Sequence, residues 1–406
     1  MRKKIINKGD ESELQGRRVI ERLGVLPNHI DSTQILFHCA SVGEINVAAP
    51  LIGHLFADDS ELRVTISTTS LTGAVLAKKL FGDRVQHCFL PFDLPIFVNK
   101  FLRRLSPALL VVTEVEFWPN LLQQAYKKKI ASVLINGRIS SKSVSTYMKL
   151  HGIYKHTLRK FDIICAQSQL SYDNFLRIGV YQARLQLTNN IKFDLQKHVS
   201  DDEKAQQLLK LFDIESDKIM VGASTHEPEE QLLLATFSLL RQENSNLKLV
   251  LVPRHPHRFD EVFTLCKATG LSVNRLSTTD SLSTEPSDIW VIDKMGWLKA
   301  CYALCQFAFI GGSFAQKGGH NALECALYAK PMAMGPSIFN NPEICNQLAS
   351  VDALAICQSH DEMTDVFQAL QMDRDLANKQ GLAGANLLAS NAGATEKTLN
   401  IIKTLI

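Results

Sequence analysis

Three glutamates follow apolar segments in the first half of the chain, where a buried strand would lead into a helix. Glu44 comes shortly after one such segment, and Glu114 and Glu116 come directly after 109–113. A carboxylate at such a place could take a proton from a sugar hydroxyl as a general base. If Glu114 and Glu116 are both desolvated, the pKa of one of them should rise. The alternative for all three is a helix-capping or helix-dipole role.

Two glycine pairs in the second half of the chain suggest a phosphate-binding turn. Gly311–Gly312 and Gly318–Gly319 follow an apolar segment and precede a helical pattern that carries His320, Asn321 and Glu324. Open backbone amides at the start of a helix bind phosphate, and Glu324 could hold a ribose diol. The stretch matches neither the Walker A nor the dinucleotide-binding glycine pattern. A tight turn before an N-capped helix is the alternative.

Cations occur near these turns. Arg254 offers a forked guanidinium that suits phosphate, and Lys192 adds a second positive charge. His255 and His257 would suit a metal, but no carboxylate or cysteine nearby completes a ligand set, so we expect no metal site.

A polar loop follows the first strand that is expected in the second half. Ser224, Thr225 and His226 are hydrogen-bond donors in this loop. Glu229 and Glu230 stand in the first turn of the next helix, where we expect them to interact with the helix dipole.

Strand and helix patterns alternate along both halves of the chain, which favours parallel sheets covered by helices on both faces. We predict an α/β fold of two doubly wound, Rossmann-like domains that face a cleft, 1–197 and 198–406. Ligands of such domains bind at the carboxyl ends of the strands. The polar segment 198–203 is the expected linker, and the last helix could pack back on the first domain.

The expected strands are short apolar runs, typical of strands that are buried on both faces. They cover residues 35–39, 62–67, 109–113, 131–135, 162–166, 219–223, 247–253, 289–292, 307–310, 331–334 and 353–357. The expected helices cover residues 45–56, 70–81, 95–105, 119–129, 141–157, 169–178, 228–243, 257–269, 297–305, 320–329, 342–350, 361–372, 374–391 and 393–405.

The net charge of +3 hides an asymmetry between the two halves of the 406-residue chain. Residues 1–200 carry 27 Lys and Arg against 16 Asp and Glu, a balance of +11, so residues 201–406 carry −8. The segment 97–105 combines this positive charge with apolar residues, as a helix on an anionic membrane surface does. Solvated helix faces are the alternative. Nine scattered cysteines without a C-x-x-C pair favour reduced thiols in a cytosolic protein.

Taken together, these segments resemble the 3-deoxy-D-manno-octulosonic acid (Kdo) transferases of Gram-negative bacteria. The resemblance covers nearly the whole chain and rests on the order and spacing of seven segments, namely 41–44, 113–120, 190–194, 223–230, 253–256, 311–324 and 335–336.

The resemblance implies a glycosyltransferase of the GT-B fold, family 30, that moves Kdo from CMP-Kdo to the lipid A precursor, lipid IVA, in lipopolysaccharide biosynthesis. The reaction would invert the anomeric centre without a metal or other cofactor. The resemblance also implies that Glu44 is the general base, with Glu114 as a second catalytic residue. The positions it implies for the CMP moiety are Arg254, His255, Met295, Gly296, Trp297, Asn321, Ala322, Leu323 and Glu324, and more weakly Ser224, Ser313 and Lys192.

Some positions depart from the family pattern. Trp297 stands where the family usually has Glu, Pro228 where it has Gly, and Cys325 where it has Pro. The chain starts with the polar segment 1–10 in place of the usual hydrophobic anchor. Either the N-terminus is trimmed in this sequence or this member attaches only peripherally to the cytoplasmic face of the inner membrane. We expect no nucleic-acid partner. The alternatives are another GT-B enzyme (a sugar-nucleotide epimerase or a sialic-acid-type transferase) and a non-catalytic nucleotide- or lipid-binding protein.

Overall fold

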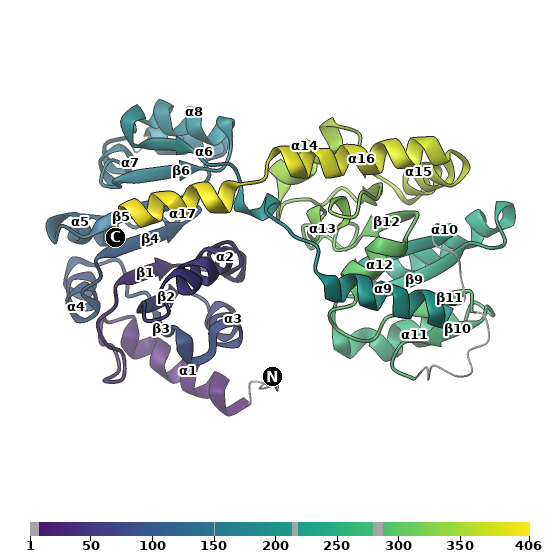
Figure 1. The fold of residues 1–406 in the computed structure, drawn as a ribbon, viewed down its shortest axis with the longest axis horizontal. Helices are drawn as coiled ribbons and strands as arrows, with labels where there is room; N and C mark the ends of the chain where they lie inside the picture. The colour runs from purple at the N-terminus through teal and green to yellow at the C-terminus, as the bar shows by residue number, and fades with distance from the viewer. Residues whose placement is uncertain (1–7, 150, 213–217, 279–286) are drawn as a thin grey trace. The chain divides into compact units, whose positions relative to one another are not determined.

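The computed structural model describes residues 8–149, 151–212, 218–278 and 287–406. It divides into two compact units, shown in Figure 1. The first consists of Met1–Asp194 together with Asn391–Ile406, and the second of Leu195–Ser390. The sequence placed the boundary between residues 197 and 198; the structure places it between Asp194 and Leu195.

The first unit is built on a seven-stranded parallel sheet with the strand order β3-β2-β1-β4-β5-β6-β7. Its strands are β1 (Ile35–His38), β2 (Val64–Thr68), β3 (Gln86–Phe89), β4 (Leu109–Thr113), β5 (Ala131–Gly137), β6 (Ile163–Ala166) and β7 (Leu185–Leu187). Its α-helices are α1 (Lys8–Glu21), α2 (Val42–Asp58), α3 (Leu71–Phe81), α4 (Pro95–Leu105), α5 (Pro119–Lys127), α6 (Ser141–Lys149), α7 (His151–Leu158), α8 (Gln169–Ile178) and α17 (Ala394–Thr404).

The second unit repeats this plan with the strand order β10-β11-β9-β8-β12-β13-β14. Its strands are β8 (Ile219–Thr225), β9 (Lys248–Pro253), β10 (Val273–Arg275), β11 (Ile289–Val291), β12 (Phe307–Ile310), β13 (Met332–Met334) and β14 (Leu354–Ile356). Its α-helices are α9 (Val199–Phe212), α10 (Glu229–Glu243), α11 (Phe259–Lys267), α12 (Leu298–Leu304), α13 (Leu323–Ala326), α14 (Pro342–Ser350), α15 (His360–Met372) and α16 (Arg374–Ser390). The prediction of two doubly wound domains is confirmed.

The prediction found the central strands and missed three strands at sheet edges. All five residues of β4 are buried, as expected for a strand in the middle of a parallel sheet. The missed strands β3, β7 and β10 are each the outermost strand of a sheet. Their sequences, Gln-His-Cys-Phe, Leu-Gln-Leu and Val-Asn-Arg, mix polar and apolar residues because one edge of each strand faces no partner strand.

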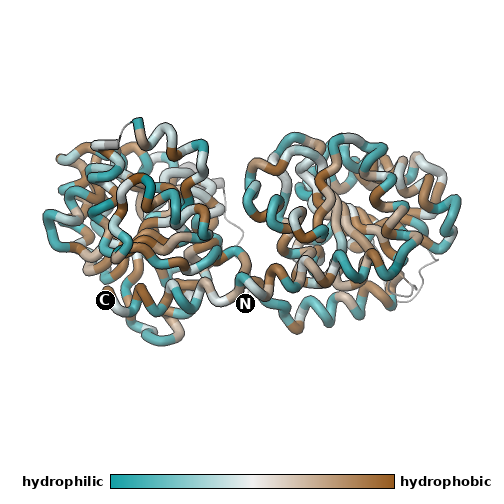
Figure 2. The backbone as a smooth tube through the Cα atoms, turned by 90° about the horizontal axis from the view of Figure 1, so that it is seen from above, coloured by the Kyte–Doolittle hydropathy of each residue, from teal (hydrophilic) through white to brown (hydrophobic). Residues whose placement is uncertain are grey.

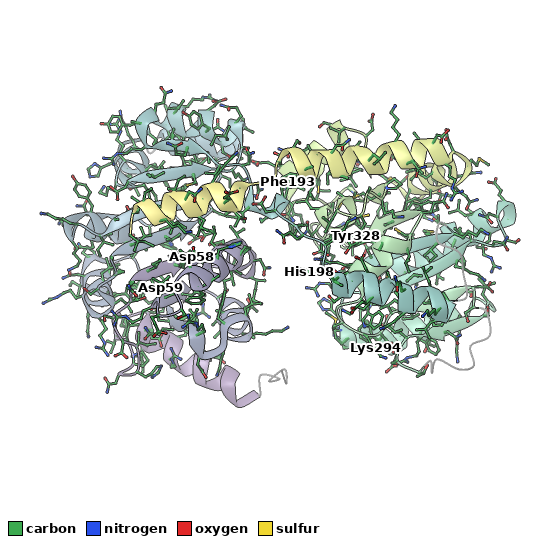
Figure 3. All side chains as sticks on the ribbon, viewed as in Figure 1. Asp58, Asp59, Phe193, His198, Lys294 and Tyr328 are labelled. Carbon is green, nitrogen blue, oxygen red and sulfur yellow. The ribbon has the colours of Figure 1, made fainter. Side chains whose placement is uncertain are left out.

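The expected linker at residues 198–203 is wrong, because this segment begins the helix α9. Asp201 of this helix accepts a hydrogen bond from the hydroxyl of Tyr328, with 3.3 Å between the two oxygens. His198 at the start of the helix and Tyr328 are labelled in Figure 3. The acidic residues that resembled a linker lie in the first turn, where the helix dipole favours negative charge. The prediction also missed α1.

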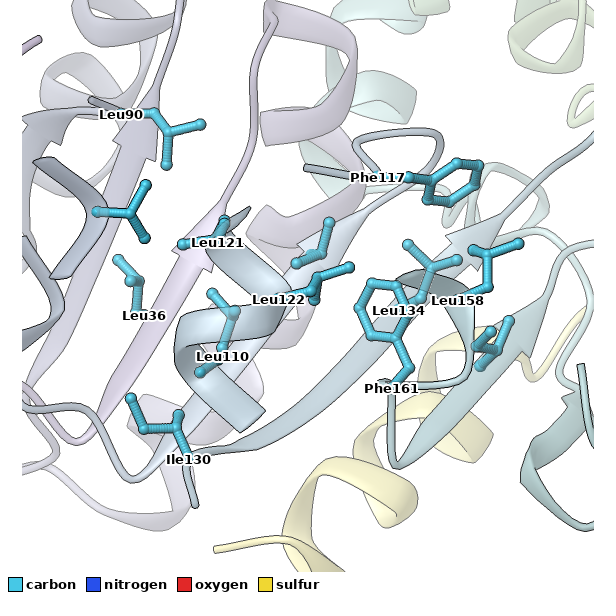
Figure 4. Close-up of a cluster of buried hydrophobic side chains, with 14 of the residues drawn as sticks. Leu36, Leu90, Leu110, Phe117, Leu121, Leu122, Ile130, Leu134, Leu158 and Phe161 are labelled. Atoms are coloured by element: carbon cyan, nitrogen blue, oxygen red, sulfur yellow. The ribbon is translucent and has the colours of Figure 1, made fainter. Parts of the chain in front are cut away.

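The apolar core of the first unit holds helices against strands in the middle of the sheet. Figure 4 shows part of this core, in which Leu36, Leu110 and Leu134 from β1, β4 and β5 meet Leu121 and Leu122 from α5. All five side chains are at most 1% exposed. Truncation of such a residue to Ala costs about 2–5 kcal/mol. In Figure 2 the hydrophobic colour is concentrated in the strands of each unit.

The C-terminal helix α17 packs in the first unit, although the chain has passed through the second unit before reaching it (Figure 1). Leu399 and Ile402 of this helix join the core that contains β1 and α2. The carboxylate of Asp194 accepts hydrogen bonds from the backbone amides of Gly393 and Thr395. Asp194 thus supplies an acceptor for the otherwise unpaired amides at the start of α17.

Candidate active site

Glu44 folds back on the start of its own helix in the first unit. The chain leaves β1 at His38, and Ser41 precedes α2. One carboxylate oxygen of Glu44 accepts from the Ala40 amide at 2.8 Å, and the other accepts from the Ser41 hydroxyl at 2.9 Å. Glu44 therefore does cap the start of its helix, and these two hydrogen bonds also hold its carboxylate in one orientation.

Burial, and after it the charge of Glu116, raises the pKa of Glu44 to about 8, although the hydrogen bonds from Ala40 and Ser41 oppose the rise. The residue is only 7% exposed. A general base works best when its pKa lies near the operating pH. Glu44 is therefore a carboxylate suited to accept a proton near neutral pH.

Glu116 keeps its charge because of two aromatic neighbours. Its carboxylate accepts from the Trp118 indole at 2.7 Å and lies 3.4 Å from the His38 imidazole. Burial alone would raise the pKa of Glu116, but the hydrogen bond and charge of His38 and the Trp118 bond together lower it. The sequence predicted that the pKa of one of Glu114 and Glu116 would rise if both were desolvated, and the pKa of Glu116 is lowered instead. Its negative charge acts on Glu44.

Glu114 lies at the end of β4 in a left-handed backbone conformation, with φ of +57°. Such a conformation is uncommon for a residue other than glycine and often marks a functional site. The carboxylate lies 2.9 Å from the ammonium of Lys192 and 3.5 Å from the guanidinium of Arg138. Lys192, expected near the donor, is thus the ion-pair partner of Glu114 within the first unit.

The glycine-rich loop of the second unit binds an anion, and that anion is the side chain of Glu229. One carboxylate oxygen accepts from the amides of Ser313, Phe314 and Ala315 at 2.8, 3.0 and 3.3 Å. The other accepts from Gly312 at 2.8 Å and from His226 at 3.0 Å. Glu229 lies in the first turn of α10, as expected, and the sequence did not show that its carboxylate also binds this loop.

The amides that were expected to be open are largely occupied. Gly318 donates to the Ser337 hydroxyl, Gly319 to the Gly312 carbonyl and His320 to the Gly311 carbonyl. The helix that follows, α13, has four residues, which is shorter than the helix expected over 320–329. An extended row of free amides at this turn is therefore not present. The glycines instead give the loop its shape: a Cβ on Gly311 would lie 2.4 Å from the Ser224 carbonyl oxygen.

Ser313 holds its loop together rather than facing an open surface, whereas Ser224 is half-buried. Ser224 has φ of +53°, at a register shift of β8. Ser313 is fully buried; its hydroxyl donates to the Ile310 carbonyl and accepts from the Gly335 amide. The side chains of Ala322 and Leu323 are also buried in the core. The side chains of Ser313, Ala322 and Leu323 are therefore almost fully buried, and among these four expected donor-site residues only the Ser224 side chain is partly exposed.

Arg254 and His255 follow β9 as exposed residues next to the loop that binds Glu229. The Arg254 amide donates to the Thr225 carbonyl at 3.1 Å, which joins this turn to the end of β8. The His255 ring meets the His226 ring edge-on, with 5.2 Å between centroids. The structure therefore brings together Arg254, His255 and His226, as expected for residues at the carboxyl ends of neighbouring strands.

Glu324 lies beside Asn321 in the short turn before and within α13. Burial raises the pKa of Glu324, against the charge of Lys299 and a hydrogen bond from Asn321. The Asn321 side chain also accepts from the Leu323 amide at 3.2 Å. A carboxyl group held in this way could accept a hydrogen bond from a sugar diol.

The turn Met295–Trp297 is held by a residue that sequence analysis missed. The ammonium of Lys204, on α9, donates to the Gly296 carbonyl at 2.7 Å and lies 5.6 Å from the centre of the Trp297 ring. Met295 beside it is 59% exposed. No pattern in the sequence connected Lys204 with this turn, because the helix α9 was not predicted and its first residues were assigned to a linker over 198–203.

Across the described parts of the chain, no group of three or more His, Cys, Asp and Glu side chains has the arrangement needed to hold a metal ion. All nine cysteines are buried free thiols.

Comparison with known proteins identifies relatives along nearly the whole chain. Residues 17–195 match the family described as 3-Deoxy-D-manno-octulosonic-acid transferase (kdotransferase). The 3-deoxy-D-manno-octulosonic acid transferase of Haemophilus influenzae is 34% identical over 390 residues, which are 95% of this chain and 91% of that protein. The C-terminal CMP-Kdo binding domain of WaaA from Acinetobacter baumannii is 32% identical and covers 50% of this chain and 99% of that domain, with a TM-score of 0.41.

Solved structures also match both units together. The UDP-GlcNAc 2-epimerase of Neisseria meningitidis covers 92% of this chain and 100% of its own, with a TM-score of 0.59 and 13% identity. At this identity the match concerns the fold alone. Two Rossmann-like units of this kind form the GT-B fold, which confirms the expected fold class.

Proposed function

Because this chain belongs to the 3-deoxy-D-manno-octulosonic acid (Kdo) transferase family, we propose that it transfers Kdo from CMP-Kdo to the lipid A precursor lipid IVA. The reaction would invert the anomeric centre and would need no metal or other cofactor. The observation that carries the proposal is Glu44, a buried, oriented carboxyl group whose pKa is raised to about 8.

In the proposed reaction Glu44 accepts the proton of an acceptor hydroxyl. The hydroxyl oxygen forms a bond to the anomeric carbon of Kdo from the face opposite the leaving group. The bond from that carbon to the CMP phosphate oxygen breaks, and its electron pair leaves with CMP. A base that activates the acceptor hydroxyl fits inversion, because the hydroxyl oxygen then attacks one face of the sugar while CMP leaves from the opposite face.

The second unit would bind the donor. Arg254, which is exposed beside the Glu229 loop, would pair with the CMP phosphate and stabilise the charge that grows on it as the bond breaks. Glu324, held by Asn321, would accept from the ribose hydroxyls. Trp297, with the Lys204 ammonium beside its ring, would meet the nucleoside. The family resemblance supports these roles, and they are assigned here to side chains that a ligand could reach.

The first unit would receive the lipid acceptor at an anionic membrane surface on the cytoplasmic face of the inner membrane. Exposed apolar side chains precede and begin α4: Phe92 is 52%, Leu94 54% and Ile96 78% exposed. The guanidinium of Arg22 lies 5.2 Å from the Phe92 ring, and Arg103 and Arg104 end the same helix. Apolar and cationic groups together suit the interface of an anionic bilayer. No helix in the described part of the chain could cross a membrane.

A transfer assay tests this proposal. The purified chain would be incubated with CMP-Kdo formed in situ and with lipid IVA in detergent, and products would be read by mass. A mass gain of one or more Kdo residues is expected, also in the presence of a metal chelator. If this chain gives no mass gain while a reference transferase is active under the same conditions, the acceptor assignment is refuted. Loss of transfer on chelation would refute the metal-free mechanism.

A further inference from the structure

Two histidines from different loops of the second unit form a direct imidazole pair. The Nε2 atoms of His226 and His320 lie 2.8 Å apart, and the ring planes differ by 7°. His226 belongs to the loop after β8, and its own amide binds the Glu229 carboxylate. His320 ends the glycine-rich loop, where its ring lies against Gly312; a Cβ there would be 3.0 Å from it. The pair therefore occupies the point where both loops meet.

The short contact fixes the protonation of the neutral pair. One Nε2 must carry hydrogen and donate, and the other must be bare and accept. A further proton can enter at the Nδ1 atom of the donating ring without breaking the contact. The pair can thus take up one proton and keep its geometry, whereas a second proton would put two donors face to face.

The surroundings of the pair are rich in positive charge. Burial, followed by the charges of neighbouring histidine, arginine and lysine side chains, lowers the pKa of both His226 and His320 to about 4. The charged or titratable groups around the pair are Arg254, Arg258, His255, His257 and Lys317, together with two acids that are already engaged, Glu229 by backbone amides and Glu230 by Arg258. A site with this charge balance attracts an anion.

We propose that the His226–His320 pair is an oxyanion subsite of the second unit and that it takes up a proton when an oxyanion binds beside it. His255 and Arg254 flank the same site. The anion favours the protonated pair by direct charge attraction. By linkage, the protonated pair then favours the anion, so affinity should rise as the pH falls. This inference rests on the proposed function, since the donor of that reaction carries two oxyanions, a phosphate and a sugar carboxylate.

Calorimetry with three probes distinguishes the two sources of the oxyanion. CMP carries a phosphate, cytidine carries none, and free Kdo carries a carboxylate. Binding enthalpies measured near pH 7 in buffers of different ionisation enthalpy give the number of protons taken up. The test compares the wild type with a His226→Gln/His320→Gln variant. The control is His198→Gln, which removes an exposed histidine at the start of α9.

We expect the wild type to take up more protons on binding than the double variant, by up to one proton per ligand. As the pH rises, the affinity of the wild type should decrease more steeply than that of the variant. The difference should be up to about tenfold for each pH unit. If the wild type takes up more protons than the variant on binding CMP, the site binds phosphate. If it does so only on binding free Kdo, the site binds the sugar carboxylate. The His198→Gln control should match the wild type.

Two results would overturn the subsite. In the first, wild type and double variant bind CMP or Kdo with equal proton uptake, which leaves the pair as a loop contact while the transferase proposal stands. In the second, the wild type binds neither ligand, and then the donor assignment fails as well. Thermal unfolding of the variants keeps these readings separate from a folding defect, because a merely structural pair would change Tm without changing proton uptake.

Discussion

The carboxylate of Glu229 accepts a hydrogen bond from the backbone amide of Ser313 at 2.8 Å, across 84 positions of the chain. With the neighbouring amides it fills the anion-binding curve of the glycine-rich loop. A loop that resembles a phosphate cradle is therefore shaped around a side chain of the protein itself. This contact holds the ends of β8 and β12 together and positions His226 and His320 above them.

Replacement of Glu229 should destabilise the second unit. Glu229→Ala removes a buried acceptor from five backbone amides, and we expect the free energy of unfolding to fall by about 3–5 kcal/mol. Glu229→Gln should not restore it, because both carboxylate oxygens accept and the amide NH2 would face donors. Urea unfolding measures the loss, with Glu243→Gln at the end of the same helix as the control. Wild-type stability of the Gln variant would contradict this role.

The raised pKa of Glu44 predicts a pH dependence of stability. Its pKa rises from 4.5 in the unfolded chain to about 8 in the folded protein. The folded state therefore binds more protons between these values, and stability falls as the pH rises through this window. A pKa that differs by one between the two states changes the free energy of unfolding by at most about 1.4 kcal/mol. Glu44→Gln mimics the neutral group, so its Tm relative to wild type should increase from pH 5 to pH 9.

Thermal unfolding across this pH range, with exposed Glu61→Gln as the matched control, provides the measurement. A constant Tm difference between Glu44→Gln and wild type would show that Glu44 ionises normally.

Removal of the Glu116 charge should shift the pH profile of transfer. Glu116 raises the pKa of Glu44 by charge repulsion, second only to burial. In Glu116→Gln the pKa of Glu44 should therefore fall, and the acidic limb of kcat/KM should move to lower pH. The base should also become weaker, so the plateau rate should drop. An unmoved limb with a normal Tm would exclude Glu116 as a tuning residue.

The exposed apolar residues at the start of α4 should control attachment to lipid. A Leu94→Ser/Ile96→Ser variant loses two side chains that a bilayer would bury, and each should weaken partitioning by about tenfold. Sedimentation with phosphatidylglycerol vesicles and with neutral phosphatidylcholine vesicles separates the apolar part from the charged part. Leu239→Ser, 50% exposed in the second unit, serves as the control. Equal binding of all variants would place the membrane contact elsewhere.

The sequence predicted the fold well where burial alone decides it. Central strands such as β4 are apolar throughout, and their positions follow from composition. The edge strand β10, with a single apolar residue, carries no such signal, since its pairing with β11 comes from tertiary structure. Similarly, Asp201 and Asp202 suggested a linker because an acidic first turn and a solvated linker have the same composition.

The residues of the candidate site likewise include some that local sequence predicts and some that only the tertiary structure reveals. Local sequence placed Glu44, Glu114 and Arg254 correctly at strand ends, because each lies a few residues after an apolar run. It could not show which anion the glycine-rich loop holds, since Glu229 reaches that loop only after β8 and β12 pair. The His226–His320 contact joins residues 94 positions apart and has no local signal.

The most direct test of the account is the comparison of Kdo transfer and CMP binding in Glu44→Ala. We predict that transfer falls by about 10²-fold or more, with CMP affinity within twofold of wild type, because Glu44 and the donor-binding residues belong to separate units. Glu61→Ala should retain both properties. Transfer at the wild-type rate in a folded Glu44→Ala protein would contradict the assignment of Glu44 as the general base.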